Sequence, residues 1–384
     1  MSHFDVIVAG GSISGLMAAR EAARAGASVA VLEEDAEIGT PEHCGGLVSM
    51  EGMKNLGIVP DASAIENGRI KRAKILSPSN GFELSAEKQK VVVLDRRALD
   101  KQVALQAQRA GADIRVKCSV RSFSQENKQY AVKTSEGDFT SNYFVDARGV
   151  ASIIGRNRDG VLSSAQYEVF APWIERDAIE VAFDSEKYPG FFAWVIPTGD
   201  GRGKVGVAGK GINAASALKS YMDAKGGQHS VVRKVYAPIW VMGPIDNFVS
   251  GRTVIVGDAA GQTKPTTAGG IYTCGMGGLL AGRAIARAIS ANDDTLNEYP
   301  KGWSAMFGEE FSKMLIARRL LERLDNKALD DLFSAIPKDK LEDVSSTGDF
   351  DFHAAALAKV LDVKSAGKMA KALLGNEIRR LVDG

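Results

Sequence analysis

The chain has 384 residues, and its 48 basic and 47 acidic side chains leave a formal net charge of +1. This balance excludes a general electrostatic attraction for nucleic acid, and the length allows two or three domains with sizeable cores. Three cysteines and four histidines show no metal-ligand spacing and no disulfide framework, so we expect no metal and a reducing, cytoplasmic setting.

The N-terminal segment carries the pattern of a βαβ unit that binds a dinucleotide. Phe4–Ala9 is typical of a buried strand, Leu16–Ala25 of a helix and Ser28–Leu32 of a second strand. The turn before the helix follows a G-x-G-x-x-G pattern, which places a pyrophosphate at the helix N-terminus. The turn residues expected to hold it are Gly10, Gly11, Ser12, Ser14 and Gly15.

Two features of this unit bear on the cofactor. Ser12 stands at the middle position of the pattern, where glycine allows the closest approach, so we expect a slightly displaced pyrophosphate. Glu33 follows the second strand, 18 residues after Gly15, where an acid accepts hydrogen bonds from a ribose. Taken alone, the turn fits a tight connection without a cofactor equally well.

The next segments combine special loop geometry with a strand and a helix. Thr40–Ser49 contains Cys44 and two glycines, which indicates a loop against a flat cofactor or a tight turn around a buried thiol. Arg69–Ser85 is typical of a β-hairpin, and Val91–Leu94 of an apolar strand before a helix. Arg96 follows that strand, where it can meet a pyrophosphate or begin a solvated helix.

Two groups of strands follow. The first group ends in the turn Asp146–Gly149 and is expected over Asp113–Lys117, Val120–Phe123, Tyr130–Thr134 and Asp138–Val145. The second group alternates, carries aromatic residues and predicts an antiparallel sheet that floors a substrate cavity. Its strands are expected over Gln166–Ala171, Ala178–Phe183, Phe191–Pro197, Lys204–Ala208 and Val235–Val241, with a helix over Ala214–Ala224.

Arg252–Gly282 has the pattern of a second phosphate-type turn, far from the first. The strand Thr253–Val256 runs into Gly257 and Asp258, and a Gly/Thr-rich turn then leads into a helix. The uncharged stretch Pro265–Gly282 is too rich in glycine and threonine to span a bilayer. Two such turns predict one flavin held between them.

The order of these motifs resembles that of the p-hydroxybenzoate hydroxylase superfamily of flavoproteins. Residues 189–197, PGFFAWVIP, are similar to the P-x-x-Y-x-W-x-F-P stretch of geranylgeranyl reductases, with Phe192 for Tyr and Ile196 for Phe. The resemblance covers residues 4–290. Within the superfamily, these stretches resemble most those of archaeal digeranylgeranylglycerophospholipid reductases, which saturate isoprenoid chains.

The resemblance implies FAD as the cofactor and assigns residues to its phosphates and sugars. Ser14 and its turn would hold the pyrophosphate, Glu33 the adenosine ribose, and Val120 the adenine through its backbone. Arg96 would contact the phosphate or ribitol region, and Asp258 the ribitol and phosphate side.

Further residues are implied at the flavin ring. Cys44, Gly45 and Leu47 would line the ring, and Gly270 and Ile271 would offer it backbone N–H groups. Around the substrate, the resemblance implies a tunnel for a prenyl chain, although simple core packing explains the same side chains. These tunnel residues are Phe191, Phe192, Trp194 and Pro197.

We therefore predict an α/β (α+β) fold in three parts. A discontinuous Rossmann-type FAD-binding domain covers 1–65, 90–160 and 248–298, and an antiparallel-sheet substrate domain covers 66–89 and 161–247. A C-terminal helical region covers 299–384, and its basic amphipathic segment His353–Arg380 can rest on an anionic membrane or form a solvated face.

The implied activity is an FAD-dependent oxidoreductase acting on isolated C=C bonds of geranylgeranyl chains, in isoprenoid lipids or prenyl diphosphates. Hydride from reduced flavin N5 and a proton would add across the bond. Cys44, an ordered water and the flavin itself are the candidate proton donors. The electron donor stays open among ferredoxin, a deazaflavin and a nicotinamide, because Asp146–Gly149 departs from the usual Ala-Asp-Gly.

Two alternatives remain. One is an aromatic monooxygenase or halogenase of the same superfamily, although halogenases carry W-x-W-x-I-P and only Trp194 matches here. The other is a flavin- or lipid-binding electron carrier without turnover, since no general-acid pair is evident. We expect a cytoplasmic protein with peripheral contact to the inner membrane face and no nucleic-acid partner.

Overall fold

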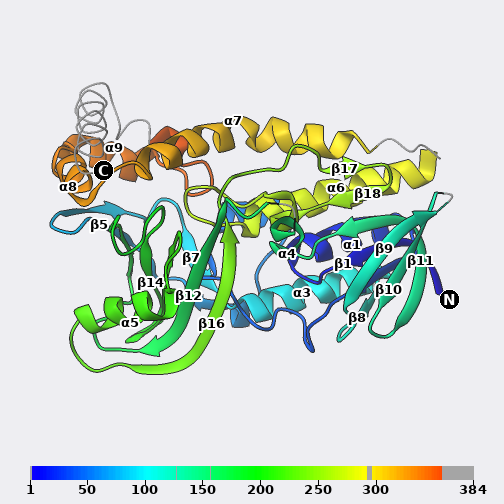
Figure 1. Cartoon of the computed structure of the whole chain (residues 1–384), viewed down its shortest axis with the longest axis horizontal. Helices are drawn as coiled ribbons and strands as arrows, with labels where there is room; N and C mark the ends of the chain where they lie inside the picture. Colours follow the sequence, from blue (N-terminus) through cyan, green and yellow to red (C-terminus); the bar gives the residue numbers. More distant parts are fainter. Residues whose placement is uncertain (1, 127, 156, 292–295, 357–384) are drawn as a thin grey trace.

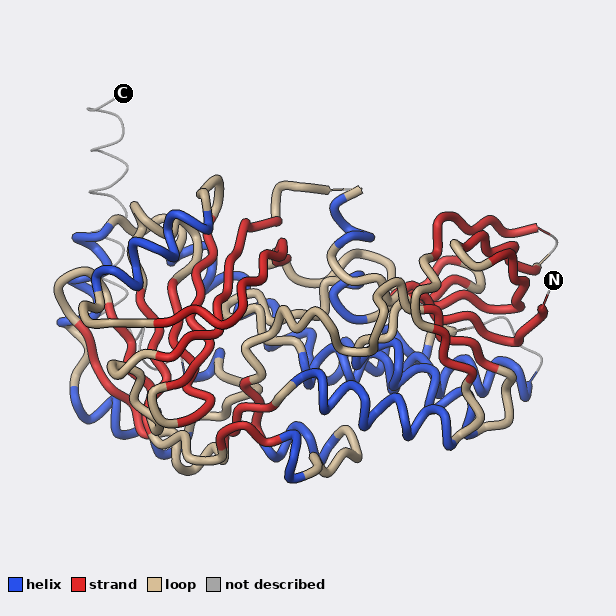
Figure 2. Tube along the Cα trace, turned by 90° about the horizontal axis from the view of Figure 1, so that it is seen from below, coloured by secondary structure: helices blue, strands red, loops and turns tan. Residues whose placement is uncertain are grey.

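Two large sheets lie at opposite ends of the long axis (Figure 2). The computed structural model describes residues 2–126, 128–155, 157–291 and 296–356. Helix α6 (Ile271–Ala291) lies beside the first sheet, and α7 (Glu298–Leu321) runs back along it toward the second. There the chain forms α8 (Asn326–Ser334) and α9 (Lys338–Thr347) (Figure 1). Long helices thus connect the two ends.

The eight-stranded sheet has a parallel centre of the kind predicted for a dinucleotide fold. Its central order is β18 (Thr253–Ile255), β11 (Gly137–Asp146), β1 (Ser2–Ala9), β2 (Val29–Leu32) and β8 (Asp113–Arg115). Antiparallel additions are β17 (Val249–Ser250), β10 (Gln129–Thr134) and β9 (Val120–Glu126). Val8 faces the helices and Ile7 faces the β9–β10 side, so both faces of β1 are buried.

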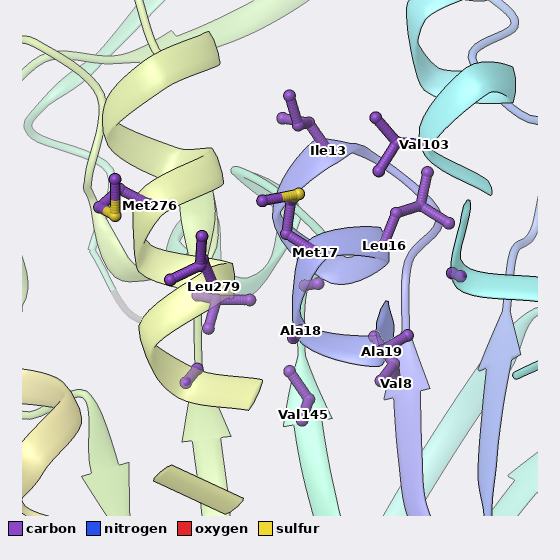
Figure 3. Close-up of a cluster of buried hydrophobic side chains, with 14 of the residues drawn as sticks. Val8, Ile13, Leu16, Met17, Ala18, Ala19, Val103, Val145, Met276 and Leu279 are labelled. Carbon is purple, nitrogen blue, oxygen red and sulfur yellow. The ribbon is translucent and has the colours of Figure 1, made fainter. Parts of the chain in front are cut away.

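Helix α1 (Ile13–Arg24) packs between α3 (Arg96–Arg109) and α6, as Figure 3 shows for Met17 against Leu279 and Leu16 against Val103. The contact with α6 is close because glycines face α1. A Cβ atom on Gly278 would lie 2.0 Å from the carbonyl oxygen of Ser14. The α6 backbone therefore lies directly against the start of α1.

The seven-stranded sheet contains the aromatic-bearing strands. Its order is β16 (Ser230–Trp240), β12 (Val161–Phe170), β15 (Arg202–Gly209), β14 (Ala193–Gly199), β13 (Ala178–Ala182), β5 (Arg72–Leu76) and β6 (Gly81–Ser85). Helix α5 (Ala214–Ala224) covers one face. The expectation of a purely antiparallel sheet is wrong at one place, because β5 pairs with β13 in parallel. The predicted hairpin, β5 and β6, therefore belongs to this sheet although it precedes the other strands of the sheet by about 80 residues or more in the sequence.

Smaller elements connect these parts. An antiparallel three-stranded sheet contains β3 (Leu47–Ser49), β7 (Val91–Leu94) and β4 (Ile65–Asn67). Short helical segments are α2 (Met50–Asn55), η1 (Ala62–Ala64), α4 (Ala151–Ile154) and η2 (Gly257–Ala260). In the described part of the chain, no helix is long and apolar enough to cross a bilayer. Most of the predicted basic segment, from residue 357 on, lies outside the described residues.

Candidate functional site

The first turn is tightly built around Gly10. Its N–H donates to the Leu32 carbonyl at 2.9 Å, its φ is +109°, and a Cβ atom there would lie 2.3 Å from the Ala147 oxygen. Gly15 packs as closely on the Gly10 carbonyl. Ser12 precedes α1 without using its side chain as a cap, so the N–H groups of the first helical turn face outward for another acceptor.

Glu33 lies against this turn, as the spacing predicted. Its Oε2 accepts from the Gly11 N–H at 2.6 Å, and its Oε1 accepts from the Asp35 N–H at 2.9 Å. An ionised carboxylate has about four acceptor positions, so these bonds leave capacity for a ribose hydroxyl. The Glu33 carbonyl accepts from Cys118 at 2.8 Å, and Val120 follows in β9. The residues expected around the adenosine therefore lie near one another.

The second turn contacts the first. Gly257 has a φ of +69°, and a Cβ atom there would lie 2.3 Å from Oγ of Ser14. Beside it, Oδ1 of Asp258 accepts from the Thr263 hydroxyl at 2.8 Å and from the Cys274 thiol at 3.3 Å. Burial, and then the charge of Asp258, raise the pKa of Cys274 well above its usual value. Its thiol is therefore a neutral donor.

Gly270 and Ile271 stand where α6 begins, beside Asp258. A Cβ atom on Gly270 would lie 2.9 Å from Sγ of Cys274 and 3.5 Å from Oδ1 of Asp258. The side chain of Ile271 is buried in the core, so only its backbone is available to a ligand. The N–H groups of the first turn of a helix have no partner within the helix. This end of α6 therefore offers donors and a partial positive charge.

The Cys44 loop lies beside Arg96. Sγ of Cys44 accepts from the Gly46 N–H at 3.3 Å, and the Arg96 guanidinium is close to the same sulfur. Burial alone lowers the pKa of Arg96, but Asp100 at 2.9 Å and Cys44 together raise it. The buried Nε–H of Arg96 finds no acceptor among the described residues. An orphaned charged donor at this place fits an anionic or carbonyl group of a cofactor.

Gln166, which the sequence did not single out, connects this loop to the aromatic strands. Its Nε2 donates to the Cys44 carbonyl at 3.3 Å, and its Oε1 accepts from the Trp194 indole at 3.1 Å. The Gln166 side chain is buried, whereas Cys44 and Trp194 are half-buried. A Cβ atom on Gly45 would lie 2.5 Å from Cδ1 of Ile196, which brings the same strand against the loop. Leu47 opens β3 just beyond.

Three of the four predicted tunnel residues form one aromatic group. The Phe191 and Phe192 rings stack at 4.1 Å, and Trp194 presents its ring to both at 6.5 and 6.2 Å. Both phenylalanines precede β14, because Phe191 closes a turn onto the Tyr188 carbonyl at 2.9 Å. Pro197 lies further along the strand, where its carbonyl accepts from Asn67 at 2.9 Å.

A buried ion cluster holds the loop before Cys44. Nζ of Lys204 lies 2.6 Å from Glu42 and 2.8 Å from Glu66, and Glu42 also pairs with Arg233 at 2.8 Å. The Lys204 and Glu42 side chains are both 0% exposed. Burial alone disfavours either charge, but their attraction raises the pKa of Lys204 and lowers that of Glu42. Both are therefore ionised at neutral pH.

The segment 349–354 covers the turn before α6, a second feature that the sequence did not reveal. Buried Lys264 donates to the Phe350 carbonyl at 3.1 Å and lies 3.6 Å from Asp351, which accepts from Ser49. Thr266 bonds to Nε2 of His353 at 2.6 Å. Lys264 and Thr266 are far from residues 349–354 in the sequence, so only the folded chain shows that these two segments are in contact.

These observations define a class of protein. The FAD binding domain family matches residues 3–189, which contain the first turn, the Cys44 loop and Arg96. The orphaned Arg96 Nε–H, the open start of α1 and the close approach of Gly257 fit a flavin dinucleotide. The protein is an FAD-dependent oxidoreductase, and FAD is its cofactor.

Relatives narrow the class. Over 368 residues the chain is 31% identical to digeranylgeranylglycerophospholipid reductase 2 of Methanopyrus kandleri, covering 88% of this chain and 92% of the relative. It is 30% identical over 365 residues to digeranylgeranylglycerophospholipid reductase 2 of Methanothermobacter thermautotrophicus, covering 89% and 94%. The chain belongs to the digeranylgeranylglycerophospholipid reductase family.

Solved structures agree with this placement. A geranylgeranyl bacteriochlorophyll reductase-like protein of Thermoplasma acidophilum superposes with a TM-score of 0.85 at 26% identity, covering 98% of this chain and 100% of that one. Halogenase PltM in complex with FAD gives a TM-score of 0.65 at 14% identity, covering 98% and 92%. The second likeness shows the fold alone.

Proposed function

We propose that this protein reduces isolated C=C bonds in the geranylgeranyl chains of isoprenoid lipids. One observation carries the proposal: Trp194, Gln166 and Cys44 form a hydrogen-bonded chain from the aromatic group to the loop beside the flavin site. Apolar substrate walls and the reducing cofactor would thus share one cavity. The names of the curated relatives support the same substrate class.

The two turns and two helix starts are the proposed FAD-binding elements. We propose that the start of α1 and Arg96 bind phosphate oxygens, that Glu33 binds the ribose, and that Asp258 binds the ribitol hydroxyls. Reduced FAD, when bound, supplies a hydride. Neither carbon of an isolated alkene is electrophilic, so the reaction depends on close positioning. The chain's own part is to orient the prenyl double bond at the cofactor and to exclude water.

Cys44 is the proposed proton donor. Its sulfur is fixed by the Gly46 N–H, and its loop is fixed through Gln166 and through the ion pair of Glu42 with Lys204. The neighbouring Arg96 guanidinium stabilises the negative charge left on sulfur after the proton leaves. The proton then bonds to the alkene carbon that does not receive the hydride.

The test is anaerobic turnover of the FAD-loaded protein. Dithionite-reduced protein is incubated with a digeranylgeranylglycerol lipid, and the mass of the product is measured by mass spectrometry. We expect a gain of two hydrogens for each double bond reduced. Unchanged lipid with fully reduced, FAD-loaded protein would favour an electron carrier, and oxygen consumption with an aromatic substrate would favour a monooxygenase.

Cys44 variants separate the proton donor from the loop. Cys44→Ala is expected to keep its FAD and lose at least about 100-fold in turnover, the usual range for a positioned acid. Cys118→Ala, at a buried thiol in the core cluster of the β9–β10 side, is the matched control. Full activity of Cys44→Ala would assign the proton to water or to the flavin and leave Cys44 a loop role.

Membrane contact and the electron donor complete the proposal. A lipid substrate has to be taken from a membrane, so we propose a peripheral contact with the membrane surface, tested by sedimentation with anionic vesicles. Reduction of the bound flavin by ferredoxin, a reduced deazaflavin or a nicotinamide, each added alone, identifies the donor. Asp146 binds Arg148 at 2.9 Å, so Arg148→Ala tests whether that turn serves a nicotinamide.

A further inference from the structure

A cavity of about 510 Å³ lies between the loop that precedes β14 and helices α7 and α8. Its apolar wall consists of Phe183, Phe191, Phe192, Leu321, Leu324 and Leu329. Thr266 also lines it, and Thr266 belongs to the turn that follows Asp258. The cavity therefore extends from the aromatic group and adjoins the proposed flavin-facing turn. Its volume is within the range of small-molecule sites.

One cation reaches this apolar wall. Arg318 of α7 is 4% exposed, and its guanidinium donates to the Gly190 carbonyl at 2.8 Å and the Pro265 carbonyl at 3.3 Å. It also pairs with Glu322 and lies 5.9 Å from the centre of the Phe191 ring. Its buried Nε–H has no acceptor in the described part of the chain. An unsatisfied buried donor of this kind is unfavourable, and a hydrogen bond to a ligand oxygen would remove that cost.

The charges around Arg318 select the kind of oxygen. Among the described lining residues, Arg318 is accompanied by three carboxylates, Asp184, Glu322 and Asp325. Glu322 already neutralises the guanidinium directly. Asp184 is paired with Lys187 at 2.9 Å, outside the cavity lining. A phosphate placed here would meet a lining in which three carboxylates outnumber the one guanidinium, which is already paired with Glu322. A neutral acceptor gains the hydrogen bond without that repulsion.

We infer that the Arg318 Nε–H donates a hydrogen bond to an uncharged oxygen of the isoprenoid substrate, either an ether or a hydroxyl oxygen. The adjoining prenyl carbons lie against Phe191, Phe192 and Leu321, and any phosphate of the lipid stays outside the cavity. The inference rests on the proposed function, since it deepens the choice of substrate at the same site. It makes α7 part of the substrate site, where the sequence indicated only a helix.

Equilibrium binding to the oxidised, FAD-loaded protein tests this site without turnover. Four probes with the same C20 chain type are compared by fluorescence titration: geranylgeraniol, a digeranylgeranylglycerol diether, geranylgeranyl diphosphate and an oxygen-free C20 polyene. Arg318→Lys keeps the charge and removes the Nε donor. Arg319→Lys, at the exposed neighbouring position, is the matched control.

We expect Arg318→Lys to weaken the alcohol or the diether about 10- to 100-fold, the loss of one charged hydrogen bond, and to leave the polyene unchanged. Weakening of the alcohol alone assigns a hydroxyl, and weakening of the diether alone assigns an ether oxygen. Equal loss for the polyene, or no loss for any probe, would overturn the inference. So would a diphosphate that binds wild type at least tenfold more tightly than the alcohol.

A second variant guards against misfolding. Leu321→Trp narrows the cavity without removing any bond of Arg318, and it should weaken all four probes while FAD content and melting temperature stay near wild type. Normal binding by this variant would place the lipid elsewhere. Failure of the proposed function can be distinguished from failure of this inference. If only the proposed function is wrong, the lipid binds in an Arg318-dependent way but is not reduced by the reduced protein.

Discussion

A Cβ atom on Gly257 would lie 2.3 Å from Oγ of Ser14, although 243 residues separate the two positions in the chain. Contacts between non-bonded heavy atoms are most favourable near 3.5–4.0 Å, so even one methyl group cannot be accommodated without movement. The start of α1 and the turn that carries Asp258 are therefore fixed to each other through a glycine.

We expect Gly257→Ala to separate the two turns and to lose most of its FAD. The backbone at Gly257 has a φ of +69°, which adds strain of about 1–2 kcal/mol for any other residue. Gly211→Ala is the matched control, since Gly211 has a φ of +71° and no atom near its missing Cβ. Flavin absorbance per mole of purified protein measures the loss. Equal FAD content in the two variants would show that the Ser14 contact is unimportant.

Gln166→Leu is expected to slow turnover with FAD content unchanged. The substitution leaves the Trp194 indole N–H and the Cys44 carbonyl without their shared partner. The aromatic group and the Cys44 loop then lose their fixed relation, and we expect a rate loss of roughly 10- to 100-fold.

Gln166→Glu separates the two bonds. A carboxylate still accepts from the Trp194 indole but cannot donate to the Cys44 carbonyl. Single-turnover rates for the Leu and Glu variants, measured by anaerobic stopped flow, should both fall if the Cys44 bond matters. A wild-type rate in Gln166→Glu would assign the whole effect to Trp194.

Lys204→Met is expected to destabilise the fold by about 3–5 kcal/mol, because it leaves Glu42 charged and buried without its nearest partner. The Glu42 pKa is lowered in the folded state, so the stabilisation by this carboxylate is present above about pH 4.3 and lost as pH falls through the folded pKa. The Lys204 pKa is raised, so its contribution is lost only when pH rises beyond about 10.4.

Urea unfolding of wild type and Lys204→Met from pH 5 to 9 should therefore give a nearly constant difference in the free energy of unfolding. The exposed pair Lys313 and Glu309 provides the control, because solvent screens this pair and Lys313→Met should leave the free energy of unfolding close to that of wild type. A difference for Lys204→Met no larger than for the control would contradict a buried, ionised pair.

His353 gives the protein a further acid sensitivity. Burial, together with the charge of Lys264, lowers its pKa from 6.5 to about 3. Between these values the unfolded chain binds a proton that the folded chain does not, so the free energy of unfolding falls as pH drops below about 6.5. We expect His353→Gln, which stays neutral, to show a shallower loss between pH 7 and pH 5. The exposed His3→Gln should follow wild type, and identical slopes for all three proteins would refute the assignment.

Local pattern was sufficient for much of this architecture. The predicted order of β1, a glycine turn, α1, β2 and Glu33 is confirmed, and the helix expected over Ala214–Ala224 has those bounds. These elements are predictable because hydrophobic period and turn chemistry act over a few residues. The parallel pairing of β5 with β13 was missed, since alternation along a strand carries no information on the direction of its partner.

The parts of the site that were missed depend on contacts distant in the chain. Gln166 stands in an ordinary alternating strand, and only the fold reveals that its amide links Cys44 to Trp194. Arg318 follows a helical pattern that gives no sign of the cavity beside it. The place of Pro197 in a substrate tunnel stays a prediction; its carbonyl accepts from Asn67.

The late position of residues 349–354 in the chain determines when their contacts can form during synthesis. At about 5–20 residues per second, a ribosome adds residue 350 roughly 17–70 s after Gly10. Throughout that interval the nascent chain carries the first turn without the segment that bonds to Lys264, Thr266 and Ser49. The contacts that this cover makes with Lys264, Thr266 and Ser49 therefore form only after both glycine turns have been synthesised.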